Sequence, residues 1–331
     1  MIRTFRYAYI LAKIYGSLAK TYVGANFQDL LRLKRLEEIF DQLFPGERSA
    51  TQEETLSAEL EARIVTAGIR SMTEILSLLG DPPDILVHIL RKYEYQSVKS
   101  VMRSLTREKG EEPVIWDLGK YALLRPGKGR DLEKTIAASP YAWVLPNLRS
   151  MPLFQIENML DRDYYSTLLA LARGLPARDR SGVMRIVSLE MTLENAIWAL
   201  RLRFFFGLDA QAANPLMLSG MTESHRKAMA EAFEIAADSV EGWRKWKYSW
   251  LIDDQLGEAF RAPDPVRAEQ KATHRLVLRA HQLFHEDPFT LTPIVAYFKL
   301  KELETGMLKI AVEALQLSVS EREVLSMVGA G

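Results

Sequence analysis

The sequence of 331 residues contains no cysteine and carries no net charge. Without cysteine it can have neither a disulfide framework, nor a thiol nucleophile, nor a cysteine-ligated metal. Its 43 basic residues balance its 43 acidic ones, so no excess positive charge is available to attract nucleic acid or an anionic membrane. Basic and aromatic residues alternate at positions 242–250, but a helix that buries Trp243, Trp246 and Trp250 is the better interpretation. We therefore expect no nucleic-acid partner.

Long apolar runs are also missing. The apolar N-terminal stretch is interrupted by Arg3, Arg6 and Lys13 and lacks a small-residue cleavage site, so it does not have the pattern of a signal peptide. No other run reaches the roughly 18 apolar residues of a membrane-spanning helix. If the protein acts at a membrane, we expect a partner to hold it there rather than a membrane span of its own.

Motifs for catalysis are scarce. No serine–histidine–aspartate arrangement and no glycine-rich dinucleotide fingerprint is recognisable. Residues 125–130 (RPGKGR) contain part of a phosphate-binding loop, but the pattern is incomplete and a basic turn is the better interpretation. His281 and His285 have the spacing of a helical metal pair without an accompanying ligand motif, so we interpret them as a surface pair. We predict no catalytic residue, no cofactor and no metal.

One acidic group keeps an enzyme open as an alternative. Asp253, Asp254 and Glu258 loosely resemble the magnesium-binding motif of helical isoprenoid synthases. Such a site needs a second acidic cluster that faces the first, because the magnesium ions are held between carboxylates and a diphosphate. No second cluster is apparent in the sequence. A magnesium-dependent helical enzyme of this type remains an alternative.

Helical periodicity is what the sequence has in abundance. Apolar residues recur three and four positions apart in most segments, and no run has the alternation of a strand, so the predicted fold class is all-α. The clearest example is residues 189–208, which are apolar on most sides. One of those sides carries Trp198 and Phe205 beside Glu194 and Arg201. A helix apolar in several directions is predicted to lie buried in the centre of the fold.

An internal repeat follows from aligning this central segment with two others. The first two copies have a polar pair three residues apart, an apolar stretch and then a basic residue. The third is fainter, with methionine as the second member of its pair, and successive copies are 98 and 112 residues apart. Whole repeated units of this size indicate stacked or ring-like modules that share interfaces. We predict three similar helical domains at residues 1–110, 111–213 and 214–331. The equivalent positions are Glu94 and Ser97, Thr192 and Asn195, and Glu304 and Met307, followed by Arg103, Arg201 and Lys309.

These motifs resemble the C subunits of the V/A-type ATPases, a family that includes the d subunit of eukaryotic V-ATPases. That family repeats an Asp-x-x-Asn followed by apolar residues and an arginine, and it ends in a helix close to the YFKLKELE of residues 297–304. The N-terminal YAY of residues 7–9 and the pattern of residues 156–165 are also similar to the family. This chain departs from the repeat, with Glu94, Thr192 and Glu304 in place of aspartate. We expect these positions to set helix caps and packing.

The resemblance implies a non-catalytic subunit of the central stalk. Members of the family form a funnel of three helical domains, whose wide end sits on the membrane proteolipid ring and whose cavity receives the central shaft of the ATPase head. Such a subunit transmits torque for ion transport or ATP synthesis, and it is cytoplasmic and peripheral on the inner face of the cell membrane. We expect Arg103, Arg201 and Lys309 to line the socket for the shaft. The competing interpretations are ion pairs within each domain and, for the whole chain, an all-α adaptor with soluble partners.

Overall fold

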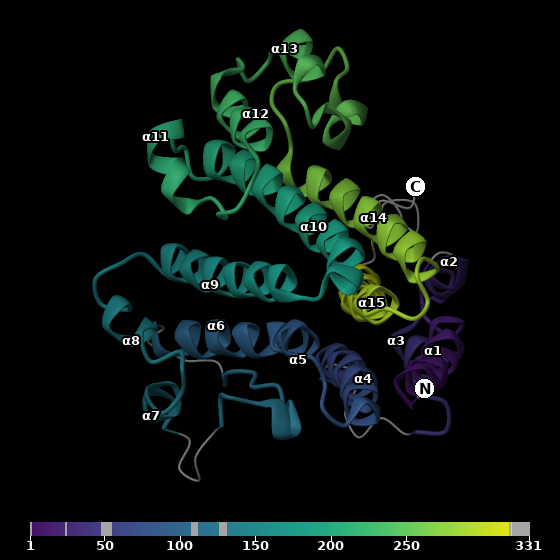
Figure 1. Cartoon of the computed structure of the whole chain (residues 1–331). Coiled ribbons are helices and arrows are strands. Elements are labelled where there is room, and N and C mark those ends of the chain that lie inside the picture. The colour runs from purple at the N-terminus through teal and green to yellow at the C-terminus, as the bar shows by residue number, and fades with distance from the viewer. Residues whose placement is uncertain are drawn as a thin grey trace.

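The computed structural model describes residues 2–23, 25–47, 55–106, 112–125, 131–317 and 319. Within these residues the chain is built from helices and contains no strand, which confirms the predicted all-α class (Figure 1). The 3-10 helices are η2 (Gly119–Tyr121), η3 (Asn214–Leu216), η4 (Ser249–Leu251) and η5 (Asp253–Gln255). The α-helices are α1 (Ile2–Leu18), α2 (Ala25–Leu31), α3 (Leu36–Leu43), α4 (Leu56–Leu79), α5 (Asp84–Leu90), α6 (Lys92–Thr106), α7 (Leu132–Ala137), α8 (Val144–Asn147), α9 (Leu153–Gly174), α10 (Ala177–Phe204), α11 (Ala210–Ala213), α12 (Glu223–Glu234), α13 (Val240–Lys245), α14 (Pro265–Phe284) and α15 (Thr292–Gln316).

Three helix pairs follow the register of the sequence repeat. The first helices of the pairs are α4, α9 and α14, which begin at residues 56, 153 and 265. The second helices are α5 with α6, then α10, and then α15. The second helix is continuous in the last two pairs, but in the first it is interrupted at Arg91. The repeat seen in the sequence therefore corresponds to one helix pair each time, whereas the proposed domain boundaries stay a prediction.

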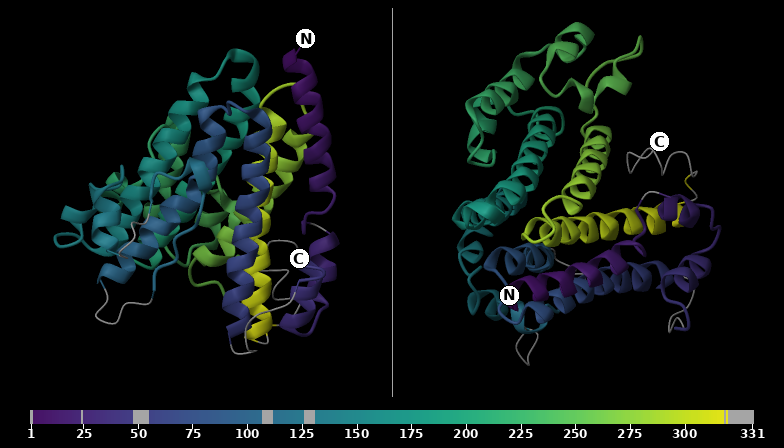
Figure 2. Two further views of the ribbon diagram at one scale, coloured as in Figure 1. Left: turned by 90° about the horizontal axis from the view of Figure 1, so that it is seen from below. Right: turned by 45° about the vertical axis from the view of Figure 1, so that its right-hand side comes forward.

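The pairs close into a cycle. Each second helix packs against the first helix of its own pair and also against the first helix of the next pair, so that α5 and α6 contact α9, α10 contacts α14, and α15 contacts α4. From a common centre the α6–α9, α10–α14 and α15–α4 combinations extend in three different directions (Figure 1). Figure 2 shows α4 and α15 side by side along most of their length. The second helices therefore meet at one end and separate at the other.

The centre of the cycle is closely packed. A Cβ atom added to Gly182 of α10 would lie 2.1 Å from Oγ1 of Thr292 at the start of α15. Beside this contact, the Asp179 carboxylate accepts a hydrogen bond of 2.9 Å from the backbone N–H of Leu291. Glycine is required here because any larger residue would push α10 and α15 apart.

The repeated polar residues anchor outer segments of the chain to the second helices. Glu94 Oε1 accepts hydrogen bonds of 2.5 Å from the backbone N–H groups of Leu123 and Leu124. Asn195 exchanges two hydrogen bonds with the backbone of Leu218. Glu304 accepts a bond of 2.7 Å from the N–H of Tyr22. These residues therefore satisfy backbone groups of distant segments, as packing anchors, and the expectation of helix caps was wrong.

Two expectations about the central and tryptophan-rich segments need correction. The central helix α10 ends at Phe204, and Phe205, which was expected to be buried, is 59% exposed. Residues 242–250 are not one helix, because α13 ends at Lys245. The break leaves Trp243 and Trp246 buried with their indole N–H groups donating to backbone carbonyls. In a single helix the two indole N–H groups would have a fixed relative orientation. The break lets each indole turn toward its own carbonyl acceptor.

Candidate functional site

The three basic residues singled out in the sequence lie at equivalent junctions of the cycle. Arg103 of α6 pairs with Glu157 of α9 at 2.7 Å, and Arg201 of α10 pairs with Glu269 of α14. Lys309 of α15 pairs with Glu61 of α4 at 3.3 Å. Each cation thus forms an ion pair with the first helix of the next helix pair. Glu157 and Glu269 are themselves 112 residues apart, so two of the three junctions repeat with the same residue types.

Two adjoining hollows lie among these helices. The larger has a volume of about 820 Å³, and Arg103 and Lys309 are on its wall. The smaller, which we name the cup, has a volume of about 160 Å³ and includes Arg201. Lys92 lines both hollows, and the Arg201–Glu269 ion pair joins the cup to the wall of the larger hollow. The three predicted residues therefore lie on the walls of two hollows that share Lys92, and we name the two hollows together the depression.

Stripes at helical spacing form the walls of this depression. Each second helix contributes residues at repeat-equivalent positions, starting from Lys92, Glu190 and Glu302. Positions 4 and 11 residues farther along lie on one helical face and are about 6 Å and about 16 Å from the start. The lining residues at these positions are Gln96, Glu194 and Gly306 in the nearer layer and Arg103, Arg201 and Glu313 in the farther one.

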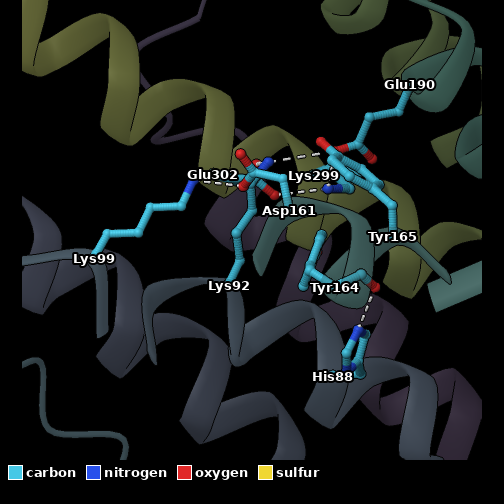
Figure 3. Close-up of polar contacts among 9 residues, drawn as sticks. All are labelled: His88, Lys92, Lys99, Asp161, Tyr164, Tyr165, Glu190, Lys299 and Glu302. Atoms are coloured by element: carbon cyan, nitrogen blue, oxygen red, sulfur yellow. Dashed lines mark hydrogen bonds and ion pairs between the residues drawn. The ribbon is translucent and has the colours of Figure 1, made fainter. Parts of the chain in front are cut away.

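A buried ionic cluster forms the floor. Lys299 Nζ lies 2.7 Å from Glu190 Oε1 and 2.8 Å from Glu302 Oε2 (Figure 3). Lys92 contacts the same two carboxylates from α6. The Tyr165 hydroxyl donates to Glu190 at 3.2 Å. We name Lys92, Glu190, Lys299 and Glu302 the floor cluster, and it joins α6, α10 and α15 where they meet.

Mutual compensation sets the charge states of the floor cluster. Burial disfavours the charged form of Lys299, but the carboxylates of Glu190 and Glu302 outweigh it and raise the pKa of Lys299. Burial also opposes ionisation of Glu302, yet the Lys299 and Lys92 ammonium groups lower its pKa to about 2. Lys299 and Glu302 are therefore both ionised at neutral pH.

The opposite end of the depression is apolar and open. Leu317, which lines the larger hollow, follows directly after the end of α15 and is 67% exposed. Val114 and Val266 line the larger hollow and are also exposed. Clustered exposed apolar residues mark surfaces that another molecule covers. The depression thus changes from an ionic floor, through a polar wall, to an apolar rim.

The other residues that the sequence suggested as sites either contact neighbouring side chains or lie outside the described residues. Asp253 and Asp254 both pair with Lys271 of α14, so they face a cation rather than a second acidic cluster. His285 lies 3.4 Å from the Tyr15 hydroxyl. In the described ranges no group of three acidic or histidine side chains is placed to hold a metal ion. Residues 126–130 of the RPGKGR turn lie outside the described residues.

Sequence reasoning missed the floor cluster and the cup. Lys92, Glu190 and Glu302 are charged residues on helices, which normally indicate a solvated face. The repeat could have revealed them, because they stand two residues before Glu94, Thr192 and Glu304.

Among the described helices, none combines the length and the apolar character needed to cross a bilayer.

Repeated helix pairs that close into a cycle define an all-α repeat protein. Residues 10–327 match the model of the ATP synthase (C/AC39) subunit family, and the chain belongs to that family. The family resemblance found in the sequence is thereby confirmed.

Individual relatives agree with this assignment. The chain is 22% identical over 255 residues to the C subunit of the A-type ATP synthase of Methanosarcina mazei, covering 73% of this chain and 69% of that protein. It is 24% identical over 271 residues to the corresponding protein of Halorubrum lacusprofundi, covering 73% and 72%. A Treponema pallidum protein that bears no functional name is 27% identical over 304 residues, covering 89% and 88%. The chain is therefore a divergent member of the family.

Proposed function

We propose that the chain is a non-catalytic central-stalk subunit of a V/A-type ATPase that couples the shaft of the ATPase head to the membrane proteolipid ring. In this role the depression is a socket for the tip of the shaft, and the three helix pairs are the domains of a funnel. The protein transmits torque for ion transport or ATP synthesis. It resides in the cytoplasm, peripheral on the inner face of the cell membrane, and is held there by the ring.

The observation that carries this proposal is the common orientation of the three second helices. Repeat-equivalent positions of α6, α10 and α15 line one depression, with the floor cluster at one end and exposed apolar residues at the other. The stretch from Lys92 to Arg103 rises about 16 Å along its helix. A depression whose wall follows a rigid helix over that length suits the end of a helical rod better than it suits a small substrate.

Charge along the wall supports recognition by complementary side chains instead of by net charge. The larger hollow is lined by three basic residues, Lys92, Arg103 and Lys309, and by three acidic residues, Glu269, Glu302 and Glu313. Arg103 and Lys309 are 51% and 44% exposed in their side chains, so their ion pairs can exchange for partner groups at little cost. The proposal therefore assigns Arg103, Arg201 and Lys309 to shaft contacts.

The first test is a pull-down of the tagged full-length chain from gently solubilised native membranes, with the bound proteins identified. We expect to recover the shaft proteins, the proteolipid ring and the ATPase head together. Val266→Asp combined with Leu317→Asp places charge on the exposed rim of the larger hollow and should reduce shaft recovery at least tenfold. Leu278→Asp, at a 46% exposed residue of α14 outside both hollows, is the matched control. Recovery of soluble proteins without ring or shaft would favour the adaptor.

A second set of variants tests the basic wall residues. Arg103→Glu, Arg201→Glu and Lys309→Glu together should abolish shaft binding. Because each replaced cation has a glutamate partner, the control exchanges the partners, as in R201E with E269R, and so retains the ion pairs while inverting the wall. If shaft binding survives both sets, the socket assignment to these residues is wrong. Loss in the first set alone would show that the ion pairs only support the fold.

A further inference from the structure

The cup in the wall of the depression has charges of both signs. Most of them are already paired outside the cup: Arg201 with Glu269, and Asp161 with Lys99 at 2.6 Å. Lys92 is paired within the floor cluster. The cup is lined by Lys92, Asn158, Asp161, Tyr165, Glu194, Ile197, Trp198, Arg201 and Leu218.

Glu194 is the exception to this pairing. It forms no ion pair or side-chain hydrogen bond with any residue that the structure describes. Glu194 is an exposed residue, so a ligand can reach its carboxylate. The surrounding walls of the cup displace part of its water and raise the pKa of its carboxyl group, the Lys92 ammonium opposes this rise, and the Glu190 carboxylate adds to it. Once the paired charges are set aside, the cup therefore has one uncompensated negative charge.

Two further polar atoms of the cup residues lack partners. Asn158 is 4% exposed, and its amide nitrogen donates to the Leu216 carbonyl at 3.0 Å. Its Oδ1 atom accepts no hydrogen bond within the described part of the chain. The Trp198 indole nitrogen likewise donates none there. Buried polar atoms without partners are uncommon in folded proteins and call for an explanation. A ligand that donates to an amide oxygen and a carboxylate, and accepts from an indole, would satisfy all three residues.

We propose that the cup binds a single arginine side chain carried by the protein segment that enters the depression. Its guanidinium group donates to the Glu194 carboxylate and to Asn158 Oδ1, and a main-chain carbonyl of the same segment accepts from Trp198. The planar guanidinium supplies several donors in a fixed fork, which an ammonium does not. The aromatic walls formed by Trp198 and Tyr165 also favour a weakly hydrated cation.

This inference rests on the proposed function only for the source of the arginine, which is the tip of the shaft. The binding itself concerns the cup alone. An arginine held in one wall of a three-walled depression would fix the rotational position of the entering rod, because the other two walls have Gln96 and Gly306 where α10 has Glu194. The cup would therefore act as the element that prevents the shaft from turning in its socket.

The cup is tested with a small probe on the full-length chain. N-acetylarginine N-methylamide is titrated against protein labelled with ¹⁵N-tryptophan, and its neutral isostere N-acetylcitrulline N-methylamide serves as the comparison. The Trp198 indole resonance, assigned with Trp198→Phe, should shift with the arginine probe, and the citrulline probe should bind at least tenfold more weakly. Glu194→Gln should weaken arginine binding at least tenfold, while Glu258→Gln, at an exposed glutamate outside both hollows, should not change it.

The source of the arginine is tested separately by shaft capture. E194Q should reduce capture of the shaft tenfold or more, and the arginine probe should compete with the shaft in the wild type. Absence of a Trp198 shift, or equal binding of the two probes, overturns the proposal that the cup binds arginine. The proposed socket for the shaft still stands in that case if the wild type captures the shaft. A wild type that binds the probe but captures no shaft overturns the proposed source and, with it, the proposed function.

Discussion

Ion pairs hold the three helix pairs together at two levels, the floor cluster and the wall of the depression, and the two levels differ in exposure. At the floor, Lys299 and Glu190 are 1% and 2% exposed in their side chains. At the wall, Arg103 is 51% exposed and its partner Glu157 is 20% exposed. Breaking a buried pair leaves an uncompensated charge away from water, whereas an exposed pair is replaced by hydration. The floor therefore fixes the geometry, while the wall is free to exchange partners.

The largest expected effect is at the floor. Lys299→Met removes one cation and leaves Glu190 and Glu302 to share Lys92, so the free energy of unfolding should fall by about 3–5 kcal/mol. Lys309→Met at the wall is the control, with an expected loss below about 1 kcal/mol. Both are measured by chemical denaturation at pH 7. Equal losses for the two variants would contradict the division into floor and wall.

The acid dependence of stability should come from the same cluster. The pKa of Glu302 is lowered to about 2, so its contribution is complete above the unfolded-state pKa near 4.5 and is lost as pH falls toward 2. The expected contribution at neutral pH is roughly 3 kcal/mol. Glu302→Gln should therefore be less stable than the wild type at pH 7, and the difference should narrow between pH 5 and pH 2. A difference that is constant over this range would show that Glu302 keeps the same charge in both states.

Two glycines sharpen the contrast between the closed centre and the open depression. Gly182→Ala places a Cβ atom 2.1 Å from Thr292 Oγ1 and should destabilise the fold by about 1–3 kcal/mol. Gly306, on the wall formed by α15, has no atom within 4 Å of an added Cβ. Gly306→Ala should therefore stabilise the fold by about 0.5–1 kcal/mol, because alanine is the better helix former. Thermal unfolding of the two variants gives opposite signs if the centre is closed and the depression is open.

Much of this architecture could be predicted from the sequence, because a repeat of apolar periodicity specifies repeated helices. The repeat spacings of 98 and 112 residues reappear directly in the structure. Phe205 was misassigned to the core, because it lies just beyond the end of α10 and is 59% exposed, whereas Trp198 packs against the core as predicted. Apolar periodicity can continue past the last helical residue, so the pattern alone does not show where the helix ends.

The floor cluster shows the complementary difficulty. Lys299 is completely buried, yet it lies in a helix segment whose charges would ordinarily be assigned to solvent. Its burial becomes intelligible only when α10 supplies Glu190, which is 109 residues away along the chain. Long-range compensation of this kind depends on tertiary contacts, and a local pattern does not contain it.

The smallest expected effect is at the Arg103–Glu157 pair of the wall. A double-mutant cycle with Arg103→Gln and Glu157→Gln should give a coupling energy of about 0.2–1 kcal/mol in the free protein, since both groups regain water when the pair is removed. The same cycle across Lys299 and Glu190 should give several times more. A wall coupling as large as that of the floor would mean that Arg103 is committed to holding α6 against α9. In that case the cation could not leave Glu157 for a group on the entering shaft, and the wall would be part of the scaffold rather than of the socket.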